Sequence, residues 1–368
     1  MLQETSRPFT KPMRKHYIDN LRWLAILLLI PYHAAMAWNV WEEPNYVFFH
    51  GSKVLSSLIV FFSPYYMPLL FLLAGISTKY ALQKRTYGTY ISERAKRLLI
   101  PLLSGTLLIM PVMTFIADKF NFGYTGGSFA HLSVFFTKFT DLTGADGGFS
   151  FGQFWFLLYL FVISVIAVGM IALQKKHLSK TVSDPPFWVI IVLGAPLPLL
   201  SEILSIGGKS LAEYLYIFLV GYFVFSNDNI IGKAARYSAV LLLFGLSVSM
   251  INVYLFIWSE TKYPLLNTIT KFAAEWLMLL ALMGLGKSRL DLTGKFPAHM
   301  SKISFPFFSF HFVWVVLFQY IFSKAPISST VFLYFISVVS AYLLTFICCE
   351  ITLRVPLLCF LTGTKKRS

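Results

Sequence analysis

Two ionisable side chains, Arg22 and His33, lie within a segment that is otherwise mostly apolar. A charge in membrane hydrocarbon costs about 2.5–3.5 kcal/mol even on insertion scales, so a residue of this kind usually has a function. Eleven helical steps come to about 1100°, within about 20° of three turns, so one helix would present both groups on one face, about 16 Å apart. A neutral imidazole accepts a proton or attacks as a nucleophile, and a guanidinium binds phosphate. The pair predicts a column of polar groups within the membrane.

The composition is that of a polytopic membrane protein. Of 368 residues, 57% are hydrophobic and 13% are charged, whereas soluble domains carry about 25% charged residues. We expect an all-α integral membrane protein with about ten transmembrane helices, because mostly apolar runs of bilayer length recur along the chain. They lie near residues 21–41, 54–78, 98–117, 154–173, 187–206, 211–226, 237–259, 268–286, 303–323 and 330–353.

The basic residues predict the orientation of these helices. Cytoplasmic loops are enriched in Lys and Arg, and with the N-terminus inside, 22 of the 31 basic residues fall inside and 7 outside. The seven outside are Lys53, Lys119, Lys138, Lys209, Lys262, Lys271 and Lys324. Both tails, 1–18 and 357–368, are therefore expected in the cytoplasm, and the net charge of +15 needs no nucleic acid to explain it.

Two processing patterns are disfavoured. The basic N-terminus and the triplet from Ala35 to Ala37 resemble a signal peptide, but the basic region is long and His33 interrupts the apolar core. The three cysteines, Cys348, Cys349 and Cys359, lie in or beside the last span and are expected to pack as small apolar groups. We expect neither a disulfide framework nor a metal site.

The connection 118–153 differs from the others, because it is long and rich in Gly and Phe. It is too apolar for a solvated linker, so we predict a folded or re-entrant cap over the external mouth of a cavity. The cap ends where Trp155 and its neighbours re-enter the membrane. An ordinary interfacial belt of aromatic residues is the alternative.

Several motifs resemble the acyltransferase type 3 family of membrane-bound acyltransferases. The first is Arg22, ten residues and then His33, preceded by the stretch Tyr17 to Leu21. The others follow in family order: Gly75; Arg94, Arg97 and Pro101; Trp155-Phe156-Leu157; Ser304 to His311; and Glu350 to Pro356. The last of these looks closest to the branch that contains glucans biosynthesis protein C, thought to add succinyl groups to periplasmic glucans. The similarity covers essentially the whole chain, so we expect a single domain, 1–368, with no soluble hydrolase-like domain after the membrane part.

The resemblance implies an O-acyltransferase in a bacterial-type inner membrane. It would move an acyl group of the acetyl or succinyl class from a cytoplasmic acyl-CoA-type donor to a hydroxyl of a cell-surface or periplasmic glycan. Apart from this co-substrate, no cofactor is expected. Envelope glycan-synthesis proteins could also be partners, beside the lipid bilayer itself.

Each candidate residue has a functional and a structural interpretation. His33 is the catalytic candidate, and its alternative is a packing histidine. Arg94 and Arg97 are three residues apart on one helix face and could clamp donor phosphates while Arg22 guards the entrance. The alternatives are that Arg94 and Arg97 only fix the topology and that Arg22 only pairs with Asp19.

Further polar residues would complete a cavity. Trp155 and Glu275 are candidates for binding the acceptor, and Glu275 could instead orient a histidine. His311 could assist His33 or simply hydrogen-bond Ser304, and structural roles are favoured for both His311 and Ser304. In the last span, Glu350 and Arg354 are expected to form a local ion pair.

Two other functions stay open at this stage. A transporter or flippase could export a glycan or lipid-linked sugar, with Arg22 and His33 as gating or proton-relay groups. Broken helices in repeated halves would favour transport, but the chain shows prolines without a convincing internal repeat. The weaker alternative is a non-catalytic scaffold for an envelope glycan synthase.

Overall fold

The protein is all-α, with a small hairpin. The computed structural model describes residues 14–43, 45–139, 145, 148–177, 185–259 and 262–364, with the backbone alone for 175–177. The elements are α1 (His16–Leu27), α2 (Leu29–Met36), α3 (Lys53–Leu82), α4 (Tyr87–Leu108), α5 (Met110–Asn121), α6 (Ser128–Thr137), η1 (Gly152–Phe154), α7 (Trp155–His177), α8 (Phe187–Val192), α9 (Leu197–Leu200), β1 (Ser205–Ile206), β2 (Lys209–Ser210), α10 (Leu211–Phe223), α11 (Asp228–Arg236), α12 (Ser238–Val253), η2 (Tyr254–Trp258), α13 (Pro264–Arg289), α14 (Lys295–Phe322), α15 (Thr330–Arg354) and α16 (Pro356–Leu361).

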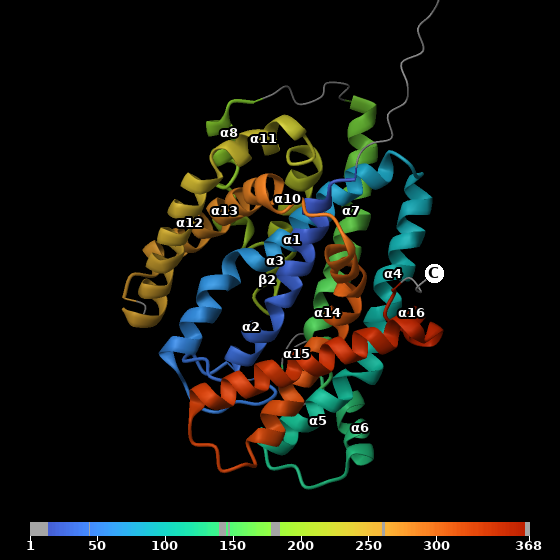
Figure 1. Ribbon diagram of the computed structural model, residues 1–368, viewed down its shortest axis with the longest axis vertical. Helices are drawn as coiled ribbons and strands as arrows, with labels where there is room; N and C mark the ends of the chain where they lie inside the picture. Colours follow the sequence, from blue (N-terminus) through green and yellow to red (C-terminus); the bar gives the residue numbers. More distant parts are fainter. Residues whose placement is uncertain are drawn as a thin grey trace, which may run out of the picture.

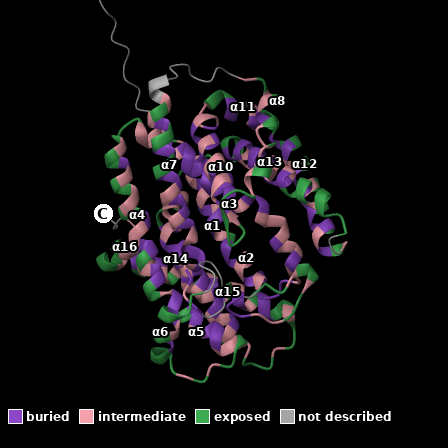
Figure 2. Ribbon diagram, turned by 180° about the vertical axis from the view of Figure 1, so that it is seen from behind, coloured by how far each residue is buried: buried purple, intermediate pink, exposed green. Residues whose placement is uncertain are grey.

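Two groups of helices flank a central set. Helices α1 and α2 both contact α14 in the middle of the molecule, with α8, α11, α12 and α13 on one side and α4 to α7 on the other (Figure 1). Buried residues run along the middle of this bundle, and exposed ones gather on outer helices such as α4 and α6 (Figure 2). The outer faces therefore carry many exposed apolar side chains, as a protein surrounded by lipid requires.

The helices confirm a polytopic membrane protein. Seven helical stretches among the described residues are long and apolar enough to cross a membrane, and α10 with α11 would make an eighth span bent by 103°. These eight match eight of the ten expected segments. The other two, 21–41 and 187–206, are built from shorter helices. The count of ten crossings and the cytoplasmic termini stay predictions.

The expected first helix is interrupted at Leu28, between α1 and α2. Pro31 has no N–H to donate to the carbonyl of Leu27, so the helical ladder loses a bond there. The hydroxyl of Tyr342 on α15 donates to that carbonyl at 2.7 Å, and Tyr334 donates to the carbonyl of Pro31 at 3.2 Å. A single neighbouring helix, α15, thus satisfies the freed carbonyl of Leu27, as membrane burial demands.

Segment 187–206 forms the short helices α8 and α9 instead of one span. Prolines follow the end of α8 in the sequence GAPLP, which breaks the ladder. Tyr216 donates to the carbonyl of Leu193 at 2.7 Å and Trp276 donates to that of Ile190 at 3.1 Å. The chain then turns through the hairpin β1–β2 into α10.

Helices α3 and α10 touch through their backbones at two glycines. A Cβ on Gly75 would lie 2.0 Å from the carbonyl oxygen of Phe218, and one on Gly221 would lie 2.3 Å from that of Leu72. Only glycine fits at such an approach, and small residues allow this close crossing of membrane helices. The contact fixes α3, which carries two polar side chains of the site described below.

Candidate active site

Five arginines line one cavity. This cavity, of about 430 Å³, is bounded by α1, α3, α4, α7 and α14, and we call it the arginine cavity. Its charged residues are Arg14, Asp19, Arg22, Arg85, Glu93, Arg94 and Arg97. Among the described residues five arginines face two carboxylates, so this part of the lining carries three uncompensated positive charges. Such an excess in a partly enclosed space suits a polyanion.

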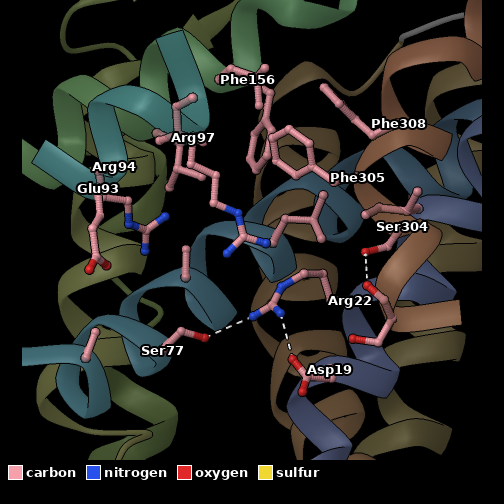
Figure 3. A pocket seen from close by; sticks show the side chains of 18 of the residues that line it. Asp19, Arg22, Ser77, Glu93, Arg94, Arg97, Phe156, Ser304, Phe305 and Phe308 are labelled. Atoms are coloured by element: carbon pink, nitrogen blue, oxygen red, sulfur yellow. Dashed lines mark hydrogen bonds and ion pairs between the residues drawn. The ribbon is translucent and has the colours of Figure 1, made fainter. Parts of the chain in front are cut away.

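The three arginines of the motifs converge on this cavity (Figure 3). Arg22 donates to Asp19 at 2.8 Å and to Ser77 at 2.9 Å. The predicted pairing of Arg22 with Asp19 therefore forms, and the guanidinium lines the cavity as well.

The other two arginines differ in how firmly they are held. Arg94 donates to the hydroxyls of Tyr90 at 2.9 Å and Thr78 at 3.2 Å. Arg97 makes no hydrogen bond or ion pair with any residue that the structure describes, and its guanidinium lies 5.7 Å from the ring centre of Phe305. Its donors are thus available to a ligand.

Apolar side chains complete the arginine cavity. Phe156, Phe305 and Phe308 gather on the side away from Asp19 and Ser77 (Figure 3). Ile26, Leu70, Ala74, Leu157 and Leu160 also contribute to the lining. The cavity therefore offers cationic groups together with an apolar surface, which a ligand with an anionic head and an apolar arm would fill.

A wider space of about 840 Å³ adjoins the arginine cavity, and we call it the vestibule. The two share Arg97 and Phe305 in their linings, and the vestibule adds Lys96 and Lys302. Segment 359–364 forms another wall. There Gly363 lies so close to α4 that a Cβ would be 2.7 Å from the carbonyl oxygen of Arg97.

His33 lines a separate cavity of about 350 Å³, which we call the histidine cavity. Trp155, Glu213 and Glu275 line it too. The connection 118–153 contributes Ala145, Gly152 and Gln153, as a cap over the cavity would, although part of that connection lies outside the described residues. The described part is folded: α6 packs on α5, and buried His131 contacts Asp118 at 2.7 Å.

His33 sits against two rings of α14. The ring of Phe312 stacks on it with centres 4.0 Å apart, and that of His311 lies 5.3 Å away. The Nδ1 of His311 contacts the carbonyl of Phe308 at 2.7 Å. A carbonyl can only accept, so Nδ1 carries the proton and Nε2 keeps a lone pair. That Nε2 is buried and has no partner among the described residues.

The arginine and histidine cavities lie back to back. Neighbouring residues on the same helices line one or the other: Phe156 and Trp155 on α7, Phe308 and Phe312 on α14, and Leu70 and Met67 on α3. A wall about one helical turn thick therefore separates them. The expectation of a single column is wrong in this respect, because Arg22 and His33 line different cavities.

Other candidates fall on both sides of this wall. Ser304 lines the arginine cavity and donates to the carbonyl of Ser301 at 2.9 Å, so the expected bond with His311 does not form. His311 lines none of the three cavities. Glu350 contacts Arg354 at 3.9 Å, but its nearer partner is His299 at 2.8 Å.

Sequence reasoning missed Glu213 and the residues that hold the arginines, Ser77, Thr78 and Tyr90. Ser210 and Glu213 have the spacing of a helix capping box, and the Ser210 hydroxyl does accept from the backbone N–H of Glu213 at 3.1 Å. Because the capping box alone explains a glutamate at this position, the sequence does not indicate that the Glu213 side chain lines a cavity.

The basic residues group as the charge distribution predicts. Both lysines of the vestibule come from segments expected inside. The arginines of the arginine cavity and the vestibule also come from such segments, except Arg22, which lies at a helix end. Both lysines of the histidine cavity, Lys209 and Lys271, come from segments expected outside.

Comparisons with known proteins give one match. No curated protein and no solved structure matches the chain. The model of the acyltransferase 3 family, described as an acyltransferase domain, matches residues 15–349. The match includes every lining residue of the arginine and histidine cavities except Arg14, and the chain belongs to the acyltransferase 3 family of membrane proteins.

Proposed function

We propose that the protein transfers an acyl group from a cytoplasmic acyl-CoA-type donor to a hydroxyl of a cell-envelope glycan. The observation that supports this most is the pair of cavities: one has an excess of three positive charges, the other contains His33, and a thin wall separates them. The likeness to the branch of glucans biosynthesis protein C makes acetyl and succinyl the groups to test first.

The arginine cavity and the vestibule suit the donor. An acyl-CoA has a polyanionic nucleotide at one end and an apolar pantetheine arm with a thioester at the other. Arg97, Lys96 and Lys302 would hold phosphates, while Phe156 and Phe308 would contact the arm near the wall. The acyl carbon would thereby approach the histidine cavity without the nucleotide entering the membrane.

His33 would act on the acceptor. It accepts the proton of the acceptor hydroxyl while that oxygen bonds to the acyl carbon, the carbon–sulfur bond breaks, and the leaving thiolate takes the proton from the imidazolium. Phe312 holds the ring of His33 by stacking. His311, with its free Nε2 next to His33, is placed to stabilise the charge that forms there.

The mass of periplasmic and surface glycans tests the proposal. Cells that express the protein should yield glycans heavier by one acyl group, and His33→Ala should remove the mass shift, because general base catalysis is worth about 10²–10⁴-fold. His50→Ala, an exposed histidine outside all three cavities, is the matched control, and membrane levels of each variant are compared by immunoblot.

Glycans of equal mass but different amount or location would reject the transferase and support the export function. Retained acylation in His33→Ala would reject the proposed base. Both outcomes can be read from the same spectra.

A further inference from the structure

The histidine cavity contains two buried carboxylates without partners. Glu275 on α13 is 1% exposed and Glu213 on α10 is 8% exposed, and both line the cavity. The Oε1 of Glu275 has no hydrogen-bond partner among the described residues. The Glu213 carboxylate likewise makes no hydrogen bond within the described part of the chain, since the capping box uses only its backbone N–H.

Buried carboxylates of this kind call for a ligand. A buried polar group without a hydrogen bond costs about 1–3 kcal/mol, and more when it is charged. Two such carboxylates, on different helices around the same cavity, can both accept hydrogen bonds from one molecule that has several hydrogen-bond donors. Lys271, one helical turn before Glu275, lines the same cavity but does not satisfy its Oε1, which keeps no hydrogen-bond partner among the described residues.

The rings and charges of the cavity narrow the class of ligand. The aromatic residues Trp155, Tyr66 and Tyr214 belong to the lining, and aromatic rings pack on the apolar faces of sugar rings. Among the described residues, three carboxyl groups line the cavity, Glu43, Glu213 and Glu275, beside the two lysines Lys209 and Lys271. Carboxyl oxygens accept hydrogen bonds from sugar hydroxyls, and they repel a carboxylate placed next to them.

We infer that the histidine cavity binds a non-acidic sugar as acceptor, with Glu213 and Glu275 accepting hydrogen bonds from its hydroxyls. The inference rests on the proposed function, because it places the acceptor beside His33. It goes further in that Glu213 and Glu275, placed beside the acceptor, would discriminate against sugars that carry a carboxylate. Glu213 and Glu275 are then specificity residues that touch the acceptor.

Binding of defined oligosaccharides to the purified, detergent-solubilised protein tests this. The probes are a neutral gluco-oligosaccharide and an oligogalacturonate of equal length, measured by titration calorimetry. The neutral probe should bind at least tenfold more tightly than the acidic one. Glu275→Gln and Glu213→Gln keep the shape of the side chain, and the double variant should weaken neutral binding about tenfold to a hundredfold.

Two controls separate local effects from misfolding. Glu202→Gln changes an exposed carboxylate outside the three cavities and should leave sugar binding unchanged. Binding of acetyl-CoA should also be unchanged in the double variant, because neither carboxylate lines the arginine cavity.

Three outcomes overturn the inference: equal or tighter binding of the acidic probe, neutral binding that survives the double substitution, and no binding of either sugar. The proposed function fails on a different measurement, when acetyl-CoA and succinyl-CoA neither bind the wild type nor release free thiol in its presence.

Discussion

Arg97 differs from the other arginines of its cavity in its contacts. Arg14 and Arg22 pair with Asp19, Arg85 pairs with Glu93, and Arg94 donates to Tyr90 and Thr78. Arg97 makes no hydrogen bond or ion pair with a described residue, and its guanidinium lies 5.7 Å from the ring centre of Phe305. A guanidinium held in place by packing but free in its hydrogen bonds is suited to binding phosphate.

We expect Arg97→Lys to weaken acetyl-CoA binding about tenfold or more. Lysine keeps the charge and so the topology, but it loses the bidentate geometry and the flat contact with the ring, and hydrogen bonds to charged groups are worth about 1.5–3 kcal/mol. The dissociation constant of acetyl-CoA is measured on purified protein. Arg289→Lys, an exposed arginine at the end of α13, serves as the control. Equal affinity in wild type and Arg97→Lys would reduce Arg97 to a determinant of topology.

Local spacing predicted some of these contacts and not others. Arg22 pairs with Asp19, three residues earlier, and Arg94 and Arg97 line one cavity, as their separation on one helix predicts. Ser77 could not be assigned, because it meets Arg22 from another helix. Glu213 could not be assigned to the histidine cavity either, because it lies on a different helix from His33. Contacts between residues far apart in the chain depend on how helices cross, which one sequence does not state.

The helices also divide into those that local sequence predicts and those that depend on residues far away in the chain. Seven apolar segments became helical stretches of spanning length, and an eighth became the bent pair α10 and α11, since hydrophobicity and length are local properties. The other two depended on long-range partners: Pro31 removes a bond from the first segment, but Tyr342 of α15 accommodates the break. Of the three cysteines expected to pack as small apolar groups, Cys349 and Cys359 are buried and Cys348 is partly exposed. Proline positions mark where a helix can break, and only the packed neighbours decide that it does.

Gly75 supports a prediction about the crossing of α3 and α10. Gly75→Ala should lower the melting temperature and the yield of folded protein, because the new Cβ would lie 2.0 Å from the Phe218 carbonyl oxygen and the helices must separate. The side chains of Ser77 and Thr78 would move with α3, so acetyl-CoA binding should weaken too. Thermal unfolding in detergent measures the first effect.

Gly169→Ala on α7 is the control, since a Cβ there meets no atom within 4 Å. Alanine is also the better helix former, so this variant should be as stable as the wild type or slightly more stable. If both variants melt alike, the close approach of α3 and α10 is not needed for the fold.

At the scale of the whole molecule, the two cavities differ in their ionisable residues. Basic residues from several separate segments gather around the arginine cavity and the vestibule, while three carboxyl groups and two lysines belong to the described lining of the histidine cavity. By the positive-inside rule we expect the arginine cavity and the vestibule toward the cytoplasm and His33 toward the outside. In the proposed function only the acyl group would then have to pass the wall of Phe156 and Phe308, and the polyanionic donor would stay on the side where it is made.

Single cysteines test this orientation directly. Thr137→Cys on α6 and Ser92→Cys on α4 are both at exposed positions. The predicted topology puts Thr137 outside the cell membrane and Ser92 on its cytoplasmic side. A membrane-impermeant maleimide should label Thr137→Cys in intact cells, and Ser92→Cys only after the membrane is permeabilised, while the wild type with its native cysteines gives the background. The opposite pattern would put the arginine cavity outside, where no acyl-CoA is available, and the proposed direction of transfer would fail with it.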